Sequence, residues 1–205
     1  METIPKVNQI KIILTFVMVA IAITLIVIFR DNLFRVKLNI TDSEKFYTEY
    51  NQVPVDNVFK YATAKEALEL FKEKQAVIFF GFKECKWCQS YAPILNDYAK
   101  ENKIETIYYI DIKEDRTNNT EEYQQLIKLL DKYLAKDENG NKRVYVPDVY
   151  FVKNGKIIGH NNDTSKEQGA DIEGYYEENG KLLKEKISKL FSKLDATCND
   201  STKGC

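Results

Sequence analysis

The sequence has few of the residues that bind transition metals, with one histidine and four cysteines among its 205 residues. A structural zinc site takes four ligands, usually supplied as two close pairs. Cys85 and Cys88 form one such pair, but Cys198 and Cys205 lie far along the chain with six residues between them, and His160 is the only imidazole. Half of a zinc site is therefore the less favoured interpretation of the Cys85/Cys88 pair, and we expect no metal ligand set.

The chain also lacks an excess of charge of either sign. Thirty Lys and Arg residues oppose 31 Asp and Glu residues, which gives a formal net charge of −1. Such a balance gives no reason to expect nucleic acid or acidic substrates as partners. With 44% hydrophobic and 30% charged residues, we expect one ordinary folded domain with appendages and no wholesale disorder.

The N-terminal part contains one long run without charge. Ile12 to Phe29 is an apolar stretch of 18 residues, bracketed by Lys11 and Arg30. As a helix it spans about 27 Å, close to the hydrocarbon thickness of a bilayer. The run ends without the small-residue cleavage pattern of a signal peptide, and no cysteine lies nearby to accept a lipid. We therefore predict an uncleaved single-pass anchor at residues 12–29 after a short tail at residues 1–11.

The charges around this run leave its orientation nearly balanced. Lys6, Lys11 and the terminal amine lie on one side, and Arg30, Arg35 and Lys37 on the other. A short tail ordinarily stays in the cytoplasm while a large domain crosses. With the cysteine-containing tail described below, this favours a cell-membrane protein whose main domain is extracytoplasmic.

The richest stretch runs from Gln75 to Pro93. Residues 77–80 are continuously apolar, which is typical of a central strand, and the apolar residues after Cys88 recur at helical spacing. Cys85 is thus expected at a helix N-terminus and Cys88 one turn into the helix. The helix dipole and free N–H groups favour a thiolate there, and the second thiol can resolve a mixed disulfide. A plain structural disulfide is the less favoured alternative at a junction between strand and helix.

The segments before this stretch predict a linker and one strand–helix unit. Residues 30–54 are expected to be a juxtamembrane linker with a short helix at 43–50, ended by Pro54. A short strand at 58–61 precedes a helix that begins at the Thr63–Glu66 capping box and runs to about residue 74. Pro93 should kink the helix that follows Cys85 and extends to about residue 102.

The remaining segments predict a third strand, two helices and a hairpin. A strand at 106–112 is followed by a helix capped by Asn119, with an apolar stripe to Leu134, and by a solvated turn at 136–143. A strand at 148–152 and its partner at 156–159 are joined by Asn154–Gly155. A polar insertion at 160–176 and a helix at 182–194 complete the domain, for the element order βα-βα-βα-ββα. The expected fold class is α/β, a mixed sheet with helices on both faces.

At this point the chain resembles the thioredoxin-fold family over about residues 55–195. Cys85-Lys-Trp-Cys88 follows the second strand of the domain, and Pro93 comes five residues after Cys88, where thioredoxins carry a kinking proline. Val146–Pro147, the apolar strand after it and the Asn-Gly turn match the family's cis-proline segment and hairpin. The anchor, the 160–176 insertion and the tail at 196–205 lie outside the resemblance.

The resemblance implies roles for the matching positions. Cys85 would be the exposed nucleophile and Cys88 the buried resolving thiol. Pro147 would be cis and would leave the Val146 backbone free to pair with a bound peptide, the alternative being an ordinary proline at the start of an edge strand. Trp87 is expected on the exposed rim of a peptide groove.

Two positions depart from the family's pattern. The buried aspartate six residues before the first cysteine is here Phe79, so the proton of Cys88 must go elsewhere, with Glu84, Asp148 and water as candidates. Glu84 replaces the tryptophan that precedes the first cysteine, and its charge should raise the thiol pKa while Lys86 should lower it.

The C-terminal tail carries the second pair of thiols. Cys198 and Cys205 lie in a polar segment whose spacing permits a disulfide, which would form in an oxidising compartment. A passive loop-closing disulfide is favoured over a shuttle that exchanges electrons with Cys85 and Cys88, and metal capture by the two thiols is less favoured still. His160 is expected to be solvated in the insertion and not catalytic.

These observations favour a membrane-tethered thiol–disulfide oxidoreductase that needs no metal or organic cofactor. Its partners would be protein or peptide thiols and disulfides, an upstream redox partner and the membrane, with no nucleic acid. The sequence leaves open whether it oxidises or reduces. The arrangement of anchor, domain and extension is also similar to Gram-positive bacteriocin-transport accessory proteins, so a binding module for a peptide exporter with little redox activity is the alternative.

Overall fold

The computed structural model describes residues 17–22, 24, 40–165 and 169–195. The chain divides into two compact units, residues 1–40 and 41–205. In the first unit, residues 17–22 and 24 are helical. The exposed fraction is between 48% and 64% for Val17, Met18, Val19 and Ile21. Within the described ranges, no helix is both long and apolar enough to cross a bilayer. Most of the predicted anchor at 12–29 lies outside those ranges.

The second unit is built on a five-stranded mixed sheet with the strand order β1-β3-β2-β4-β5. The strands are β1 (Phe59–Tyr61), β2 (Gln75–Gly81), β3 (Ile107–Asp111), β4 (Asp148–Lys153) and β5 (Lys156–Asn161). β1, β3 and β2 are parallel, whereas β4 runs antiparallel to β2 and forms a hairpin with β5. Asn154 and Gly155 make the hairpin turn with φ values of 50° and 67°, which confirms the predicted turn.

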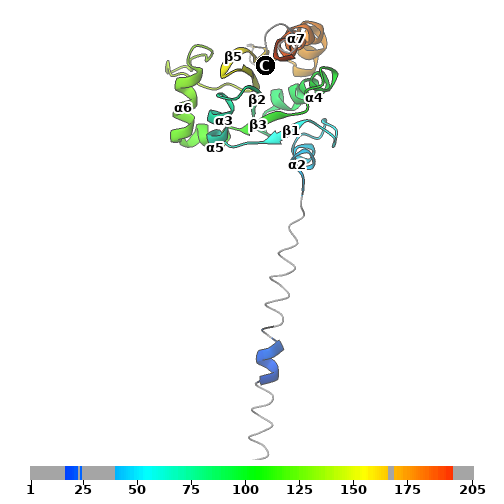
Figure 1. The fold of residues 1–205 in the computed structure, drawn as a ribbon, viewed down its shortest axis with the longest axis vertical. Coiled ribbons are helices and arrows are strands. Elements are labelled where there is room, and N and C mark those ends of the chain that lie inside the picture. Colours follow the sequence, from blue (N-terminus) through cyan, green and yellow to red (C-terminus); the bar gives the residue numbers. More distant parts are fainter. Residues whose placement is uncertain (1–16, 23, 25–39, 166–168, 196–205) are drawn as a thin grey trace, which may run out of the picture. The chain divides into compact units, whose positions relative to one another are not determined.

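Six helices connect and flank these strands in the second unit's described residues, and they cover both faces of the sheet (Figure 1). They are α2 (Asp42–Glu49), α3 (Ala64–Leu70), α4 (Lys86–Glu101), α5 (Lys113–Asn118), α6 (Glu121–Leu130) and α7 (Ile172–Asp195). One hydrophobic core lies between the sheet and α2, α4 and α7, and the other lies between the sheet and α3 and α6. The alternation of β2 explains the division, since Val77 and Phe79 face the first core and Ile78 and Phe80 the second. The result is the thioredoxin-like fold that the motifs predicted.

The folded unit begins earlier than predicted. Residues 30–54 were expected to be a linker, but α2 packs on the sheet, and Phe46, Tyr50 and Val53 are at most 1% exposed. Thr41 starts α2 with a capping box, in which its hydroxyl accepts from the Glu44 N–H. The short helix was expected, but its buried aromatic face makes it part of the core.

Two other boundaries differ for local reasons. Asn119 does not cap the helix that follows it; it ends α5 in a left-handed conformation with φ 49°, and Thr120 caps α6 through the Tyr123 N–H. α5 itself was not predicted, because its six residues bury no side chain and leave no apolar periodicity.

The polar insertion predicted at 160–176 is shorter in the structure. β5 continues through His160 and Asn161, and α7 begins at Ile172, ten residues before the predicted start of the last helix. The added first turns of α7 carry Tyr175 and Tyr176 to the end of the sheet where the cysteines lie.

Candidate active site

Cys85 and Cys88 lie where β2 passes into α4. Cys85 is the N-cap residue of α4, and its sulfur accepts a hydrogen bond from the Cys88 N–H at 3.1 Å. The two cysteines form a disulfide, with their Cα atoms 5.1 Å apart. Cys85 is partly exposed, whereas the Cys88 side chain is completely buried. The expected division into an accessible and a buried sulfur is present, and the free N–H groups of α4 point to the sulfur that a substrate can reach.

The Val146–Pro147 segment lies against this disulfide. The peptide bond between the two residues is cis, as the resemblance implied. The Val146 carbonyl oxygen is 3.9 Å from Cys85 Sγ, a van der Waals contact in the disulfide and a weak thiol hydrogen bond once Cys85 is reduced. Segments that are 61 residues apart in the chain therefore meet at the reactive sulfur.

The site is that of a thiol–disulfide oxidoreductase. A disulfide at a helix N-terminus, with one accessible and one buried sulfur, can accept a thiolate at the first and release it by attack from the second. Among residues 40–165 and 169–195, no three His, Cys, Asp or Glu side chains are grouped in a way that could hold a metal ion. Cys198 and Cys205 lie outside the described residues, so their disulfide stays a prediction.

Comparison with solved structures finds thioredoxins among the similar chains, each at low sequence identity. Oxidized thioredoxin O2 of Arabidopsis thaliana is 16% identical, with a TM-score of 0.36, and the match covers 62% of this chain and 95% of that one. Thioredoxin F of spinach chloroplast, in its short form, is 16% identical with a TM-score of 0.40, covering 67% and 96%. Plasmodium falciparum thioredoxin is 16% identical with a TM-score of 0.36, covering 62% and 97%. No protein-family model matches the chain, and neither does any curated protein.

Phe79 occupies the position of the family's buried acid and is completely buried. Its ring packs 6.0 Å from that of Tyr91, on the same side of the sheet as Cys88. Aromatic side chains therefore occupy the position beneath Cys88 where the family pattern has a buried aspartate.

Neither carboxylate proposed as a replacement is placed to serve Cys88. Glu84 is half exposed and pairs with Lys113 at 3.1 Å. A backbone N–H and then Lys113 lower the pKa of Glu84, so this carboxyl is charged at neutral pH. Asp148 pairs with Phe80 in the sheet register, and both residues belong to the face covered by α3 and α6, opposite the Cys88 face. Of the three candidates, water is the one that remains.

Asp148 has a different partner, which corrects the expectation that His160 is solvated in an insertion. Its carboxylate lies 3.1 Å from His160 Nδ1, and the imidazole stacks on Tyr150 with the ring centroids 5.2 Å apart. Burial raises the pKa of Asp148, and the contact with His160 opposes that change. Only a quarter of the His160 side chain is exposed, in strand β5. The pair stabilises the β4–β5 edge on the face opposite Cys88.

Trp87 is less exposed than expected for a residue on the rim of a peptide groove. It is half-buried and packs edge-on against Tyr175 and Tyr176 of α7, at centroid distances of 5.3 and 5.6 Å. Lys86, by contrast, is exposed at the start of α4. The aromatic wall beside the disulfide was missed because the helical pattern of α7 is weakest in its polar first turns.

Sequence reasoning also missed Gln89. Its side-chain amide donates to the carbonyl oxygens of Lys83 and Glu49, at 2.7 and 2.8 Å. It thereby joins the segment before Cys85 to the end of α2. The only signal for it is its position four residues after Cys85, on the helix turn that follows the motif.

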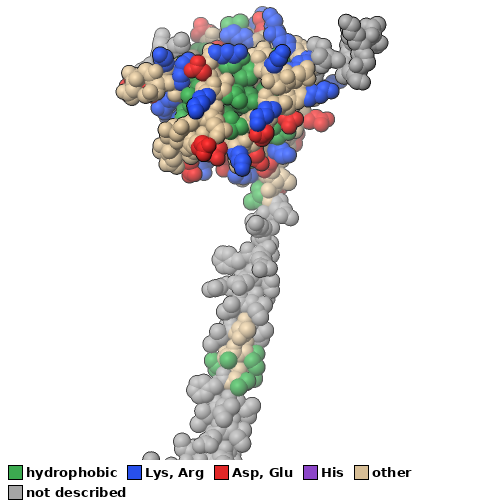
Figure 2. All heavy atoms as spheres, turned by 60° about the vertical axis from the view of Figure 1, so that its left-hand side comes forward, with side chains coloured by type: hydrophobic (Ala, Val, Ile, Leu, Met, Phe, Trp, Pro, Cys, Tyr) green, Lys and Arg blue, Asp and Glu red, His purple; other side chains and the backbone are tan. Residues whose placement is uncertain are grey.

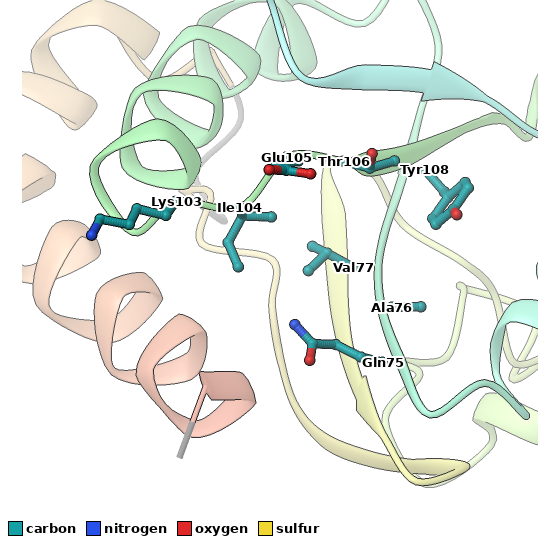
Figure 3. A pocket seen from close by; sticks show the side chains of 8 residues that line it. All are labelled: Gln75, Ala76, Val77, Lys103, Ile104, Glu105, Thr106 and Tyr108. Carbon is teal, nitrogen blue, oxygen red and sulfur yellow. The ribbon is translucent and has the colours of Figure 1, made fainter. Parts of the chain in front are cut away.

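The pocket in Figure 3 is separate from this site. It has a volume of about 300 Å³ and is lined by the first residues of β2 and the segment that leads into β3, among them Gln75, Ile104 and Thr106. Cys85 follows the opposite end of β2, and the pocket lining contains no cysteine or histidine.

Proposed function

We propose that this protein is a membrane-tethered oxidoreductase that exchanges disulfides with proteins or peptides on the extracytoplasmic side. The observation that carries the proposal is the Cys85–Cys88 disulfide, whose accessible sulfur caps α4 and lies 3.9 Å from the Val146 carbonyl. A backbone carbonyl at the reactive sulfur suits an extended polypeptide better than a small thiol, because such a chain can pair with the Val146 segment.

In the reducing direction, the thiolate of Cys85 attacks one sulfur of a substrate disulfide. A bond forms between Cys85 and that sulfur, and the other substrate sulfur leaves as a thiolate. Cys88 then loses its proton to water and attacks Cys85 Sγ, which releases the second substrate thiolate and forms the Cys85–Cys88 disulfide. Two electrons have passed to the substrate, and a dithiol redox partner restores the pair. The oxidising direction is the same sequence reversed.

The tether is supported by the apolar run at residues 12–29 and by the helical, apolar residues described within it. The extracytoplasmic placement is supported by the short N-terminal tail and by the pair Cys198 and Cys205, whose disulfide would persist in an oxidising compartment. Labelling of Cys198 and Cys205 in intact cells with a membrane-impermeant maleimide, after mild reduction, tests the placement. Labelling only after lysis would place the domain on the cytoplasmic side.

The enzymatic proposal is tested by insulin reduction with the wild type, Cys85→Ser and Cys88→Ser. We expect both variants to lose turnover, and only Cys88→Ser to accumulate a mixed disulfide with the substrate, because it keeps the attacking sulfur. Equal turnover of the wild type and Cys85→Ser would overturn the proposal and favour the alternative, a binding module that assists a peptide exporter.

A further inference from the structure

A groove with four basic side chains borders the segment that precedes Pro147. It lies among α5, α6 and the turn before Val144, and its volume is about 690 Å³. Arg116, Lys128, Lys142 and Arg143 line it, with Asp137 as the one acidic lining residue. The lining therefore has an excess of positive charge, although the chain as a whole has a net charge of −1.

Arg116 connects this groove to the active site. Its Nη1 donates to the Val144 carbonyl oxygen at 3.3 Å, two residues before Val146. Its guanidinium also lies 5.1 Å from the centre of the Phe82 ring, and the Phe82 carbonyl accepts the N–H of Cys85 at 3.0 Å. Arg116, which lines the groove, thus contacts both segments that frame the disulfide.

The two arginines have no anionic partner among the residues that the structure describes. Neither forms an ion pair there, and Arg143 Nε is enclosed without a hydrogen-bond acceptor. Burial and then repulsion by Arg143 lower the pKa of Arg116. The Asp137 carboxylate is already engaged, since it accepts the N–H groups of Asn139 and Asn141. Within the described part of the chain, the groove therefore holds two guanidinium groups that form no ion pair.

We propose that this groove binds carboxylate side chains of the substrate polypeptide, close to the cysteine that the substrate presents to Cys85. The inference rests on the proposed function and adds a substrate class to it. Guanidinium groups recognise carboxylates through paired, charge-assisted hydrogen bonds. A groove of about 690 Å³ is much larger than a single inorganic anion, and it adjoins the Val146 segment along which a substrate chain would lie.

The selectivity must come from this local site, because the surrounding surface has no dominant charge. Figure 2 brings the α6 side of the molecule forward and shows basic and acidic side chains interspersed, with apolar side chains between them. A mixed surface of this kind produces little long-range attraction. The net charge of the chain gave no indication of acidic substrates, because the basic side chains of the groove are offset by acidic side chains elsewhere.

Direct binding tests the proposal without any redox step. The probe is a peptide whose cysteine is replaced by serine, carrying two glutamates, compared with the same peptide carrying two glutamines. We expect the full-length wild type to bind the acidic peptide about three- to tenfold more tightly at about 0.02 M salt, and the difference to vanish at about 1 M. Arg143→Gln should lose the preference and Arg143→Lys should keep most of it. Lys74→Gln, which removes an exposed charge at the far end of β2, should behave like the wild type.

Turnover of the matching disulfide peptides provides the second measurement. The wild type should favour the acidic peptide by a similar factor in kcat/KM. Arg143→Gln should reduce the acidic and the neutral disulfide peptide with the same kcat/KM. Equal binding of the two peptides by the wild type, or an unchanged preference in Arg143→Gln, would overturn the inference. If the acidic peptide binds selectively but neither disulfide is reduced, the anion groove stands and the proposed function fails.

Discussion

Tyr91 lies one turn beyond Cys88 in α4 and joins this helix to β5, an edge strand of the sheet. It is fully buried, and its hydroxyl donates to Asn161 Oδ1 at 2.8 Å. Asn161 in turn contacts Asp163, whose carboxylate also accepts from Lys186 of α7. Burial raises the pKa of Tyr91 well above its ordinary value, so the hydroxyl acts here only as a neutral donor.

Tyr91→Phe should therefore destabilise the fold by about 1 kcal/mol. The cost is moderate because Asn161 Oδ1 keeps a second donor, the Asp163 N–H at 3.3 Å. Urea unfolding measures the change. Tyr98→Phe is the matched control: its hydroxyl makes one long bond of 3.4 Å to Gly180 at a partly exposed site, so a loss below about 0.5 kcal/mol is expected. Equal losses in the two variants would show that the Tyr91 hydrogen bond has no special weight.

Residue identity predicted the Cys85–Cys88 pair and the cis Pro147 well and their surroundings poorly. Cys85 and Cys88 could be assigned because they follow a strand at a fixed spacing and local spacing survives folding, whereas the cis form of Pro147 was implied by the family resemblance. The role of Asp148 could not be assigned, because its face of the sheet depends on the register with Phe80, which is a long-range pairing. His160 was assigned to a polar insertion for the same reason: only the hairpin pairing shows that it belongs to a strand.

At the scale of elements, α2 supplies an aromatic cluster that completes the core beneath β1 and β3. Phe46 stacks on Tyr50 and Phe59, with ring centroids 4.3 and 3.9 Å apart, and meets Tyr109 edge-on at 5.0 Å. Its side chain is 0% exposed. Gln89 further connects the end of α2 to the segment before Cys85. α2 is therefore a structural part of the domain that carries the site.

Phe46→Ala should cost about 3–5 kcal/mol, because it removes a large buried ring and leaves a cavity. The free energy of unfolding from urea titration measures this loss. Tyr47→Ala, on the same helix but 45% exposed, should cost less than about 0.5 kcal/mol. A similar small effect for Phe46→Ala would mean that α2 does not contribute to the core, and that the domain begins nearer residue 55 as the sequence suggested.

The two capping boxes make part of the stability depend on pH. Glu44 and Glu66 accept hydrogen bonds from the backbone N–H groups of Thr41 and Thr63, and these bonds lower the pKa of both carboxyls. A carboxyl whose pKa is lower in the folded than in the unfolded state stabilises the fold at pH values above the unfolded-state pKa. That contribution is lost as the pH falls through the folded pKa.

Combined substitution of both residues, Glu44→Gln and Glu66→Gln, should therefore flatten the acid side of the stability curve. Glutamine keeps the capping bond, so the variant should melt close to the wild type near about pH 6. Between about pH 5 and 3 the wild-type Tm should fall more steeply than that of the variant. Glu105→Gln, an exposed glutamate outside both boxes, should follow the wild-type curve. Parallel curves for all three proteins would contradict this account.

Element prediction succeeded where capping and periodicity agree and failed where an element is short or polar. The Thr63–Glu66 box and the Asn-Gly turn occur as expected, since each depends on residues at most three positions apart. α5 has no buried side chain to mark it, and the first turns of α7 are polar apart from their tyrosines. These elements position Arg116 and the wall beside Trp87, so the surface around the disulfide was the least predictable part of the site.

At the scale of the whole molecule, the chain separates into residues 1–40 and residues 41–205. The contacts described for the disulfide, from the Val146 carbonyl and the Cys88 N–H, come from the second unit. The chemistry should therefore be independent of the predicted anchor, whereas partition to the membrane should depend on it.

Residues 41–205 expressed alone should remain soluble and reduce insulin with the kcat/KM of the full chain in detergent, within about twofold. The full chain should sediment with membranes and resist extraction with carbonate, because an apolar run of 18 residues is long enough to span the bilayer. A chain that begins at Val55 is the informative control: it lacks α2, exposes the aromatic cluster of β1 and β3, and should fail to fold. Extraction of the full chain by carbonate would contradict the tether, while loss of turnover in residues 41–205 would mean that the first unit contributes to the site.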